Sequence, residues 1–276
     1  MNIAIAGLGL IGGSFAKAIK AKTGHTVLGL DCSGETLKAA FKYGAIDSAD
    51  PKGIEYADIL LAALYPKSSI EFIQANLEKL KAGAIILDLC GVKRFICTKI
   101  KALIGNRDLT FIGGHPMAGR ELSGFEHSIP TLFDGASMIL TPSPDTPPKK
   151  LDIAASLCLE IGFGNITIST PEHHDEMIAF TSQLAHIVSS AYIQNPVCDK
   201  YMGFSAGSFA DMTRVAKLNE DMWTELFLLN SDYLTAHIDI LIRNLTGFRS
   251  LIESGDMEGL RAALKTGREC KERLTP

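Results

Sequence analysis

The sequence predicts an α/β fold with a Rossmann-type, doubly wound and mostly parallel sheet, followed by an all-α domain. An apolar strand at the N-terminus runs directly into a glycine-rich turn and a helix. Strand-like and helix-like segments then alternate up to about residue 170, which is the pattern of a doubly wound sheet. After Pro171 the strand-like segments disappear and long helical patterns rich in Leu, Ile, Ala and Met take over. We therefore expect two domains, residues 1–170 and residues 171–276.

The composition is that of an ordinary globular protein. A length of 276 residues with 46% hydrophobic content is enough for one large domain or two, and a net charge of −4 gives no basic footprint for nucleic acid. The six cysteines are scattered without a Cys-x-x-Cys pair, so neither a zinc site nor a disulfide framework is indicated. No run of about 18 apolar residues occurs, and no Lys or Arg precedes the first apolar stretch as in a secretory signal. We expect a cytoplasmic protein that binds neither membrane nor nucleic acid.

The first elements form a dinucleotide-binding unit. The strand Asn2–Ala6 precedes a turn that consists of Gly7, Leu8, Gly9, Leu10, Ile11 and Gly12, and a helix follows over residues 13–22. Gly7 permits the tight turn, Gly9 lets a pyrophosphate approach the backbone, and Gly12 lets the helix pack closely on the strand. Three glycines at this spacing occur by chance roughly 0.2 times in a chain with this glycine content, so the flanking strand and helix carry the prediction.

The second strand, Thr26–Leu30, ends at Asp31. A carboxylate at this place can accept hydrogen bonds from both ribose hydroxyls of a dinucleotide and would repel a 2′-phosphate. The pyrophosphate would face the N-terminus of the preceding helix, whose amides and dipole favour an anion. The cofactor expected from these residues is NAD rather than NADP.

Later strands are predicted at residues 59–64, 84–89, 110–114, 137–141 and 165–169, and helices at residues 67–81, 93–104 and 147–161. In the second half we expect one helix over residues 171–193. Its apolar face would hold Phe180, Leu184, Ile187 and Ala191, and its polar side Ser182, Gln183, His186, Ser189 and Ser190.

The segment from Gly113 to Gly124 sets an imidazole, His115, among glycines and a proline directly after a predicted strand. A histidine titrates near neutrality, so in such a place it is suited to general acid or base chemistry. Residues 172–176 read Glu-His-His-Asp-Glu, but the spacing is not that of a metal-binding helix. We interpret this run as a helix start with acidic residues near its positive end, and we expect no metal.

Three further residues in the second half of the chain are candidates for a functional site. His186 lies within a helix, where a histidine is more often a packing residue than a ligand. Arg214 follows Asp211 by three residues, a spacing typical of a surface ion pair. Trp223 is the only tryptophan and by itself indicates a core position.

Taken together, these motifs resemble the prephenate/arogenate dehydrogenase family over nearly the whole chain. The resemblance rests on Gly7-Leu8-Gly9-Leu10-Ile11-Gly12-Gly13-Ser14, Gly114-His115-Pro116-Met117-Ala118-Gly119 with Glu121, Ser123 and Gly124, Gln183-Leu184-Ala185-His186, Asp211 with Arg214, and Met222-Trp223. The glycine turn is generic, but the His-Pro-Met-Ala-Gly segment followed by the downstream histidine and arginine is highly specific.

The resemblance implies NAD-dependent oxidative decarboxylation of prephenate to 4-hydroxyphenylpyruvate, or of arogenate to tyrosine, by a homodimer joined through its helical domain. It implies that His115 takes the proton of the ring hydroxyl and that Arg214 holds a substrate carboxylate through two parallel hydrogen bonds. His186 would help to bind substrate, and Trp223 would support the pocket wall. Glu121 would line the site, and the other residues expected to bind substrate are Gly91, Arg120 and Gln183. No metal is needed for this chemistry.

Several positions depart from the family pattern. Gly91 stands where a serine that contacts substrate or nicotinamide is frequent, Gln183 where histidine is frequent, and Ala185 where proline is frequent. Arg120 stands where a small hydroxyl residue is common. A guanidinium beside the substrate side chain would repel the ammonium group of arogenate, so Arg120 favours prephenate unless it simply faces solvent.

Two other readings stay open. A two-domain dehydrogenase acting on β-hydroxy acids or reducing imines would share the glycine turn and the helical second domain, but it would rely on a catalytic lysine or a different polar set. A non-catalytic NAD-sensing dimer would keep the first 31 residues but would give His115, His186 and Arg214 no joint task.

Overall fold

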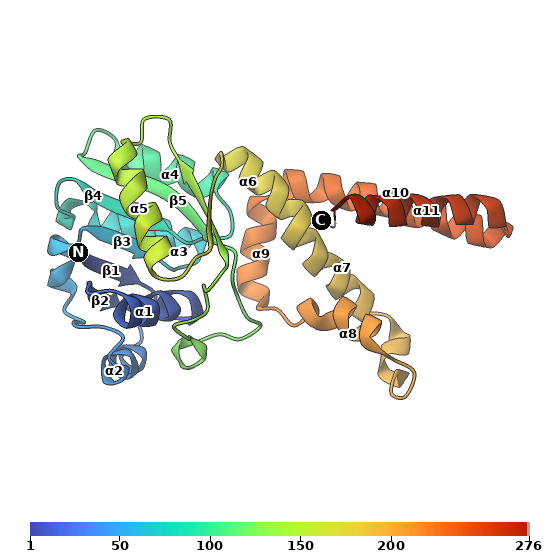
Figure 1. Cartoon of the computed structure of the whole chain (residues 1–276), viewed down its shortest axis with the longest axis horizontal. Helices are drawn as coiled ribbons and strands as arrows, with labels where there is room; N and C mark the ends of the chain where they lie inside the picture. The colour runs from blue at the N-terminus through green and yellow to red at the C-terminus, as the bar shows by residue number, and fades with distance from the viewer. Residues whose placement is uncertain (275–276) are drawn as a thin grey trace. The chain divides into compact units, whose positions relative to one another are not determined.

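The computed structural model describes residues 1–274 and shows a seven-stranded sheet with the strand order β2-β1-β3-β4-β5-β6-β7 (Figure 1). The strands are β1 (Asn2–Ala6), β2 (Thr26–Leu30), β3 (Ile59–Ala62), β4 (Ala84–Asp88), β5 (Leu109–Pro116), β6 (Ser137–Pro142) and β7 (Asn165–Ile168). Every neighbouring pair is parallel except β5 and β6. The predicted doubly wound, mostly parallel sheet is therefore confirmed, with each strand at its predicted place.

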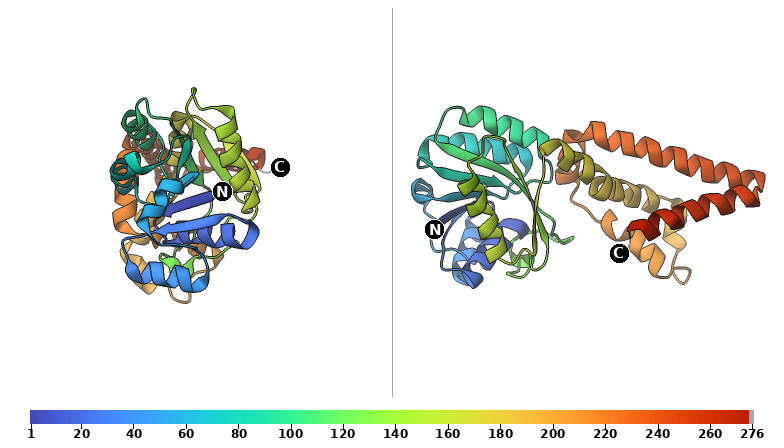
Figure 2. Two further views of the ribbon diagram at one scale, coloured as in Figure 1. Left: turned by 90° about the vertical axis from the view of Figure 1, so that its left-hand side faces the viewer. Right: turned by 45° about the horizontal axis from the view of Figure 1, so that its top comes forward.

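Helices cover both faces of the sheet (Figure 2). They are α1 (Leu10–Lys22), α2 (Gly34–Tyr43), α3 (Pro66–Asn76), α4 (Arg94–Ile104) and α5 (Pro148–Glu160). Short 3-10 turns are η1 (Pro51–Tyr56), η2 (Leu77–Lys79), η3 (Phe125–His127), η5 (Pro196–Lys200) and η6 (Arg214–Ala216). The predicted helices at residues 67–81, 93–104 and 147–161 correspond to α3 with η2, to α4 and to α5.

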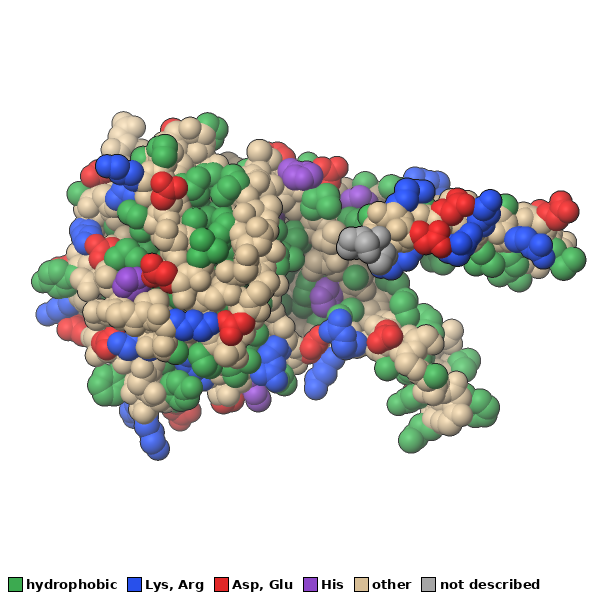
Figure 3. Space-filling view, in the orientation of Figure 1, with side chains coloured by type: hydrophobic (Ala, Val, Ile, Leu, Met, Phe, Trp, Pro, Cys, Tyr) green, Lys and Arg blue, Asp and Glu red, His purple; other side chains and the backbone are tan. Residues whose placement is uncertain are grey.

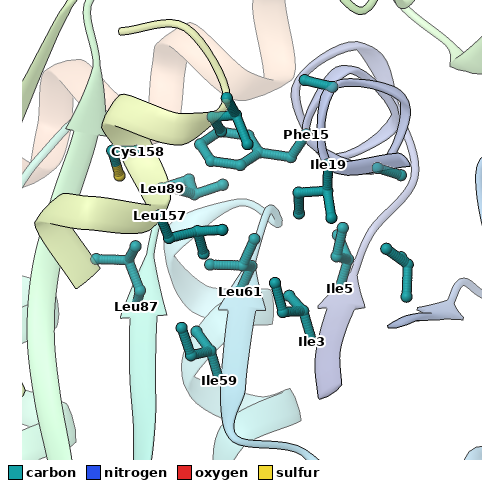
Figure 4. Close-up of a cluster of buried hydrophobic side chains, with 14 of the residues drawn as sticks. Ile3, Ile5, Phe15, Ile19, Ile59, Leu61, Leu87, Leu89, Leu157 and Cys158 are labelled. Atoms are coloured by element: carbon teal, nitrogen blue, oxygen red, sulfur yellow. The ribbon is translucent and has the colours of Figure 1, made fainter. Parts of the chain in front are cut away.

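Two buried clusters hold these layers together, one on each face of the sheet. Successive strand residues point to opposite faces, so Ile3 and Ile5 join the cluster under α1 and α5, whereas Ala4 joins the cluster under α3 and α4. Figure 4 shows the first cluster, in which Phe15 of α1 and Leu157 of α5 lie over the strands. Strands apolar on both faces are what a sheet covered on both sides requires.

The glycine turn connects β1 to α1 as the sequence predicted. Gly7 has a φ of +84°, which favours glycine, and its N–H donates to the Leu30 carbonyl oxygen at 2.8 Å. A Cβ on Gly12 would overlap the Gly7 carbonyl oxygen, whereas a Cβ on Gly9 would meet nothing within 4 Å. Gly12 is therefore required by packing inside the fold, and the backbone at Gly9 borders open space.

Beyond β7 the described chain is helical, with α6 (Pro171–Ile178), α7 (Leu184–Ile193), α8 (Gly207–Thr213) and α9 (Glu220–Leu229). These helices belong to the same compact unit as the sheet, Met1–Asn230. A second unit starts at Ser231 and consists of α10 (Ser231–Ser254) and α11 (Met257–Leu274), which pack on each other. Within residues 1–274, we find no helix with the length and apolar character needed to cross a membrane.

Residues 171–193 do not form the regular helix that the sequence predicted. A π turn, η4 (Ala179–Gln183), separates α6 from α7, and the N–H of Leu184 donates to the Ala179 carbonyl oxygen five residues back. The expected burial is also wrong: Phe180 is 56% exposed and Ala191 is exposed, while Gln183 and Ser189 are each 1% exposed. A π turn adds one residue to a turn and so rotates everything after it relative to a continuous α-helix.

This rotation decides where two histidines point. His186 follows His174 by 12 residues, and a regular α-helix at about 100° per residue would place them about 120° apart around the axis. The surplus residue of the π turn cancels about 100° of that angle. His174 and His186 therefore share one side of the α6–α7 segment.

The glycine turn yields a stability prediction. We expect Gly12→Ala to lower the free energy of unfolding by about 1–3 kcal/mol, because the new methyl group meets backbone that cannot move aside. Gly9→Ala is the matched control and should change it by no more than about 0.5 kcal/mol. Urea unfolding of both variants measures this, and equal losses would contradict the packing role of Gly12.

Candidate functional site

Four of the predicted site residues lie at the carboxyl ends of the parallel strands. Gly7 follows β1, Asp31 follows β2, Gly91 lies just after β4, and His115 is the penultimate residue of β5. In open α/β sheets, ligands bind at this edge. Strand β5 is longer than predicted, so its antiparallel pairing with β6 fixes the backbone of His115, which lies opposite Ile139.

The dinucleotide half of the site is organised by Asp31. One carboxylate oxygen accepts from the N–H of Leu8 and the other from the N–H of Ser33, both at 2.8 Å. A carboxylate has lone pairs for about four hydrogen bonds, so both oxygens can still accept from ribose hydroxyls. The Leu8 side chain itself is buried in the core, and Leu10 and Ile11 form the first turn of α1, where the N-terminal amides face the open space above Gly9. These residues fit a dinucleotide.

His115 is half-buried and is held by a second histidine. Its Nδ1 lies 2.8 Å from Nε2 of His174 on α6, with the ring centroids 5.0 Å apart. Its Nε2 has no hydrogen-bond partner within residues 1–274. A Cβ built on Gly91 would lie 3.9 Å from this Nε2 and 3.4 Å from the Leu226 side chain of α9. The free nitrogen of His115 thus faces the space beside Gly91 and α9.

His174 is in turn held by Asp175, whose side chain is fully buried. The Asp175 carboxylate lies 2.8 Å from Nδ1 of His174 and accepts from the backbone N–H groups of Lys93 and Arg94 at 2.7 and 2.9 Å. It also accepts from Nε of Arg94 at 3.3 Å. Lys93 and Arg94 begin α4, so the carboxylate sits at the positive end of that helix.

A buried ion pair lies beneath His115. Lys93 and Asp88 have fully buried side chains in direct contact, and Nζ of Lys93 also donates to the Gly114 carbonyl oxygen at 2.6 Å. Asp88 accepts from the N–H of Gly114 at 3.1 Å. Both backbone polar groups of the residue before His115 are therefore fixed by this pair.

The surroundings keep both histidines neutral. Burial, followed by the electrostatic influence of His174 and Lys93, holds the pKa of His115 well below its usual value. Burial also lowers the pKa of His174, although Asp175 opposes this effect. For Asp175 itself burial opposes ionisation, but the hydrogen bonds from His174 and the α4 amides outweigh it and lower its pKa.

A second group of predicted residues surrounds His186. Its ring lies on Trp223 with a centroid distance of 3.8 Å, and its Nδ1 donates to the Val215 carbonyl oxygen at 2.9 Å. Arg214, adjacent to Val215, forms an ion pair with Glu121. Burial lowers the pKa of His186, while the nearby Glu121 raises it and Arg214 lowers it. Four residues predicted separately from the sequence thus lie together.

Helix α9 connects the two groups. Leu226, which faces the His115 side, and Trp223, which carries His186, are three residues apart and so lie on one face about 4.5 Å apart along the axis. Gln183 donates from Nε2 to the Leu226 carbonyl oxygen at 3.3 Å and accepts from Asn230 at 2.8 Å. In this structure its buried amide holds α9, so its expected contact with substrate stays a prediction.

Other predicted residues lie apart from this network. Arg120 is exposed and forms no ion pair within the described chain. The ion pair expected between Asp211 and Arg214 is replaced by the one to Glu121. No group of three or more His, Cys, Asp or Glu side chains within residues 1–274 is placed to hold a metal ion.

Sequence reasoning missed four residues of the network: Asp88, Lys93, His174 and Asp175. The run at 172–176 does begin a helix, capped by Thr170, with Glu172 in its first turn, as predicted. What was missed is that His174 and Asp175 turn inward while His173 stays exposed. A histidine followed by Asp175 at the start of the helix after the last strand was the one local indication of this network. The partner of His174 could not be found in the same way, because His115 lies 59 positions away in the sequence.

The dinucleotide turn at the carboxyl edge of the sheet, together with an imidazole at the same edge whose Nε2 has no partner among residues 1–274, defines a dinucleotide-dependent dehydrogenase. The chain belongs to the prephenate dehydrogenase family: residues 15–166 match the family's nucleotide-binding domain and residues 170–266 match its dimerization domain. The predicted resemblance to this family is thereby confirmed, and the reading as a two-domain dehydrogenase of another family loses its support.

Similar proteins agree with this assignment. The chain is 30% identical to prephenate dehydrogenase of Bacillus subtilis (strain 168) over 99% of its length and 76% of that protein's. A structure of prephenate dehydrogenase from A. aeolicus in complex with hydroxyphenyl propionate and NAD+ superposes with a TM-score of 0.86 at 28% identity, covering 99% of this chain and 98% of that one. A structure of Synechocystis arogenate dehydrogenase gives 0.84 at 25% identity and covers all of both chains.

The depressed pKa values predict how stability depends on pH. Unfolded histidines bind protons at about pH 6.5, whereas native His115 and His174 resist protonation, so acid favours the unfolded chain. We expect the free energy of unfolding to be highest above pH 7 and to fall between pH 6.5 and 5. Each such histidine should lower it by about 1 kcal/mol per pH unit over this range.

Urea unfolding at pH 7, 6 and 5 measures this slope. His174→Gln should flatten it, and His173→Gln, which alters the exposed neighbour, should not. An identical slope in all three proteins would show that His174 is not held neutral by the fold.

Proposed function

We propose that this chain is an NAD-dependent prephenate dehydrogenase, converting prephenate to 4-hydroxyphenylpyruvate and CO₂. The observation that carries the proposal is the unpartnered Nε2 of His115 facing Gly91 and α9 at the carboxyl edge of the sheet. NAD is supported by Asp31, which would repel a 2′-phosphate, by the match to a nucleotide-binding domain, and by the similar A. aeolicus structure that holds NAD+.

The reaction needs one base and one oriented substrate. NAD supplies the hydride acceptor. His115 takes the proton from the oxygen of the ring hydroxyl through Nε2, while hydride leaves the ring carbon that carries this hydroxyl. The bond between the ring and its carboxylate then breaks, CO₂ departs, and the electron pair of that bond completes the aromatic ring. The proton returns from His115 to the phenolic oxygen, so the residue is regenerated, and aromatisation provides the driving force.

Arg214 is the residue suited to a substrate carboxylate, since its planar guanidinium can form two parallel charge-assisted hydrogen bonds. It is 65% exposed and already paired with Glu121, which is 39% exposed. Exposed ion pairs contribute little stability, so exchange of Glu121 for a substrate carboxylate costs little. His186 and Trp223 form the adjacent wall and position the backbone of Val215 beside Arg214.

Arogenate is the second candidate substrate, because the similar Synechocystis structure is an arogenate dehydrogenase. The two substrates differ in the side chain, which is a keto acid in prephenate and an amino acid in arogenate. Arg120 lies next to Glu121 in the exposed segment that follows β5. Its positive charge would disfavour the ammonium group, and this favours prephenate.

We further propose that residues 1–170 bind the cofactor and that residues 171–276 bind substrate and form a homodimer. The boundaries of the two family matches support the division. The α10–α11 hairpin exposes large apolar side chains, namely Ile240, Ile242, Leu245, Ile252 and Leu264. Figure 3 shows apolar side chains along one edge of this hairpin. Such surfaces mark association sites.

Incubation with prephenate and NAD tests the function directly. We expect NADH absorbance to rise, and His115→Asn to lower kcat by about 10²–10⁴-fold, because proton transfer to a positioned base contributes that much. The dissociation constant for NAD should stay within about twofold, because His115 takes no part in the dinucleotide turn. Absence of turnover in the wild type, or loss of NAD binding in the variant, would contradict the assignment.

The substrate preference is tested by Arg120→Ala. The ratio of kcat/KM for prephenate to that for arogenate should fall by about 5–10-fold, as expected for loss of a partly screened charge repulsion of about 1 kcal/mol. Lys149→Ala, which removes another exposed cation on α5, is the control. If Arg120→Ala leaves this ratio unchanged, Arg120 faces solvent and does not contribute to the substrate preference.

A further inference from the structure

We propose that Asp175 and His174 are positioning residues that hold His115 in the tautomer with hydrogen on Nδ1, leaving Nε2 as the basic nitrogen, and that they share the proton it accepts. The kinetic part of this proposal rests on the function proposed above. The tautomeric part concerns the free protein and stands by itself.

The charge state of Asp175 is fixed by its surroundings. Its buried carboxylate accepts from the backbone N–H groups of Lys93 and Arg94 and from Nε of Arg94. All of these are donors, so the carboxylate is ionised and can only accept. The contact of 2.8 Å to His174 therefore requires a hydrogen on Nδ1 of His174.

The hydrogen on Nδ1 of His174 in turn determines the tautomer of His115. A neutral imidazole carries one hydrogen, so Nε2 of His174 holds a lone pair. That nitrogen lies 2.8 Å from Nδ1 of His115, and a contact this short needs a hydrogen between the two nitrogens. The hydrogen must come from His115, which therefore carries it on Nδ1. The lone pair of His115 is left on Nε2, on the side of Gly91.

The same chain of contacts defines where a transferred proton can go. When Nε2 of His115 takes the hydroxyl proton, the Nδ1 proton can pass to Nε2 of His174, which places the positive charge next to Asp175. The charged groups around this path act differently on the two histidines. Lys93, which is paired with Asp88, disfavours a positive charge on His115. Asp175, to which Arg94 is bound, favours a positive charge on His174. No oxidant or other reactant is involved, because only protons move.

Two substitutions at His174 separate this role from packing. His174→Gln keeps an acceptor, since the Gln amide oxygen can receive the Nδ1 hydrogen of His115. His174→Met has a similar length but no strong acceptor. His173→Gln alters the neighbouring exposed histidine and serves as the control. Circular dichroism and urea unfolding verify that each variant is folded, and both readouts below are taken only from folded protein.

The first readout is the ¹⁵N NMR spectrum of histidine-labelled protein, with the His115 signals assigned by comparison with His115→Asn. In the wild type and in His174→Gln we expect His115 to show a protonated Nδ1 and a bare Nε2. In His174→Met the Nε2–H form should become populated. A merely structural role would leave the tautomer unchanged, so either an Nε2–H form in the wild type or an unchanged spectrum in His174→Met overturns the proposal.

The second readout is steady-state kinetics with prephenate and NAD. We expect kcat to fall at least 30-fold in His174→Met and to recover by at least fivefold in His174→Gln, with KM for NAD unchanged within about twofold. Equal kcat values for the two variants overturn the positioning role. If the wild type oxidises no prephenate, the proposed function fails, and the NMR result still decides the tautomer.

Discussion

The buried carboxylate of Asp175 at the start of α4 is the contact on which the site depends. It joins the helix that follows the last strand to the helix that follows β4, and it does so by satisfying amides that the α4 N-terminus leaves unpaired. A buried charge is tolerated only when donors surround it, and here the donors come from α4, Arg94 and His174. The hydrogen bonds of this one carboxylate thus hold α6 against the start of α4, where His174 reaches His115 of β5.

Much of the nucleotide-binding part could be predicted from sequence because its signals are local. The turn at Gly7 to Gly12 and the carboxylate of Asp31 each follow directly from a neighbouring strand, and the structure places them as expected. The association of His174 with His115 is different. It depends on a fold that brings β5 and α6 together. The sequence around His173 and His174 does not indicate which of these two histidines turns inward. The π turn was missed because apolar periodicity assumes a uniform helix.

Two ion pairs of opposite character divide the site into a fixed part and an exchangeable part. Lys93 and Asp88 are fully buried and hold the backbone of Gly114 on both sides. Removing one partner would leave an uncompensated charge in the interior, so this pair cannot adapt during a reaction. Arg214 and Glu121 are exposed to solvent and can separate at little cost. The site thus combines a stationary imidazole, His115, with a guanidinium, Arg214, whose carboxylate partner can be exchanged.

The π turn also limits how this protein can vary over evolutionary time. Its surplus residue is stored in one wide turn, so a deletion between positions 179 and 183 would yield an ordinary α-helix with a full set of backbone hydrogen bonds. The downstream helix would then swing by about a quarter of a revolution, carrying His186 away from Trp223 while His174 kept its place. Point substitutions along this stretch leave the number of residues in the turn unchanged, whereas loss of a single residue would require half of the site to be rebuilt.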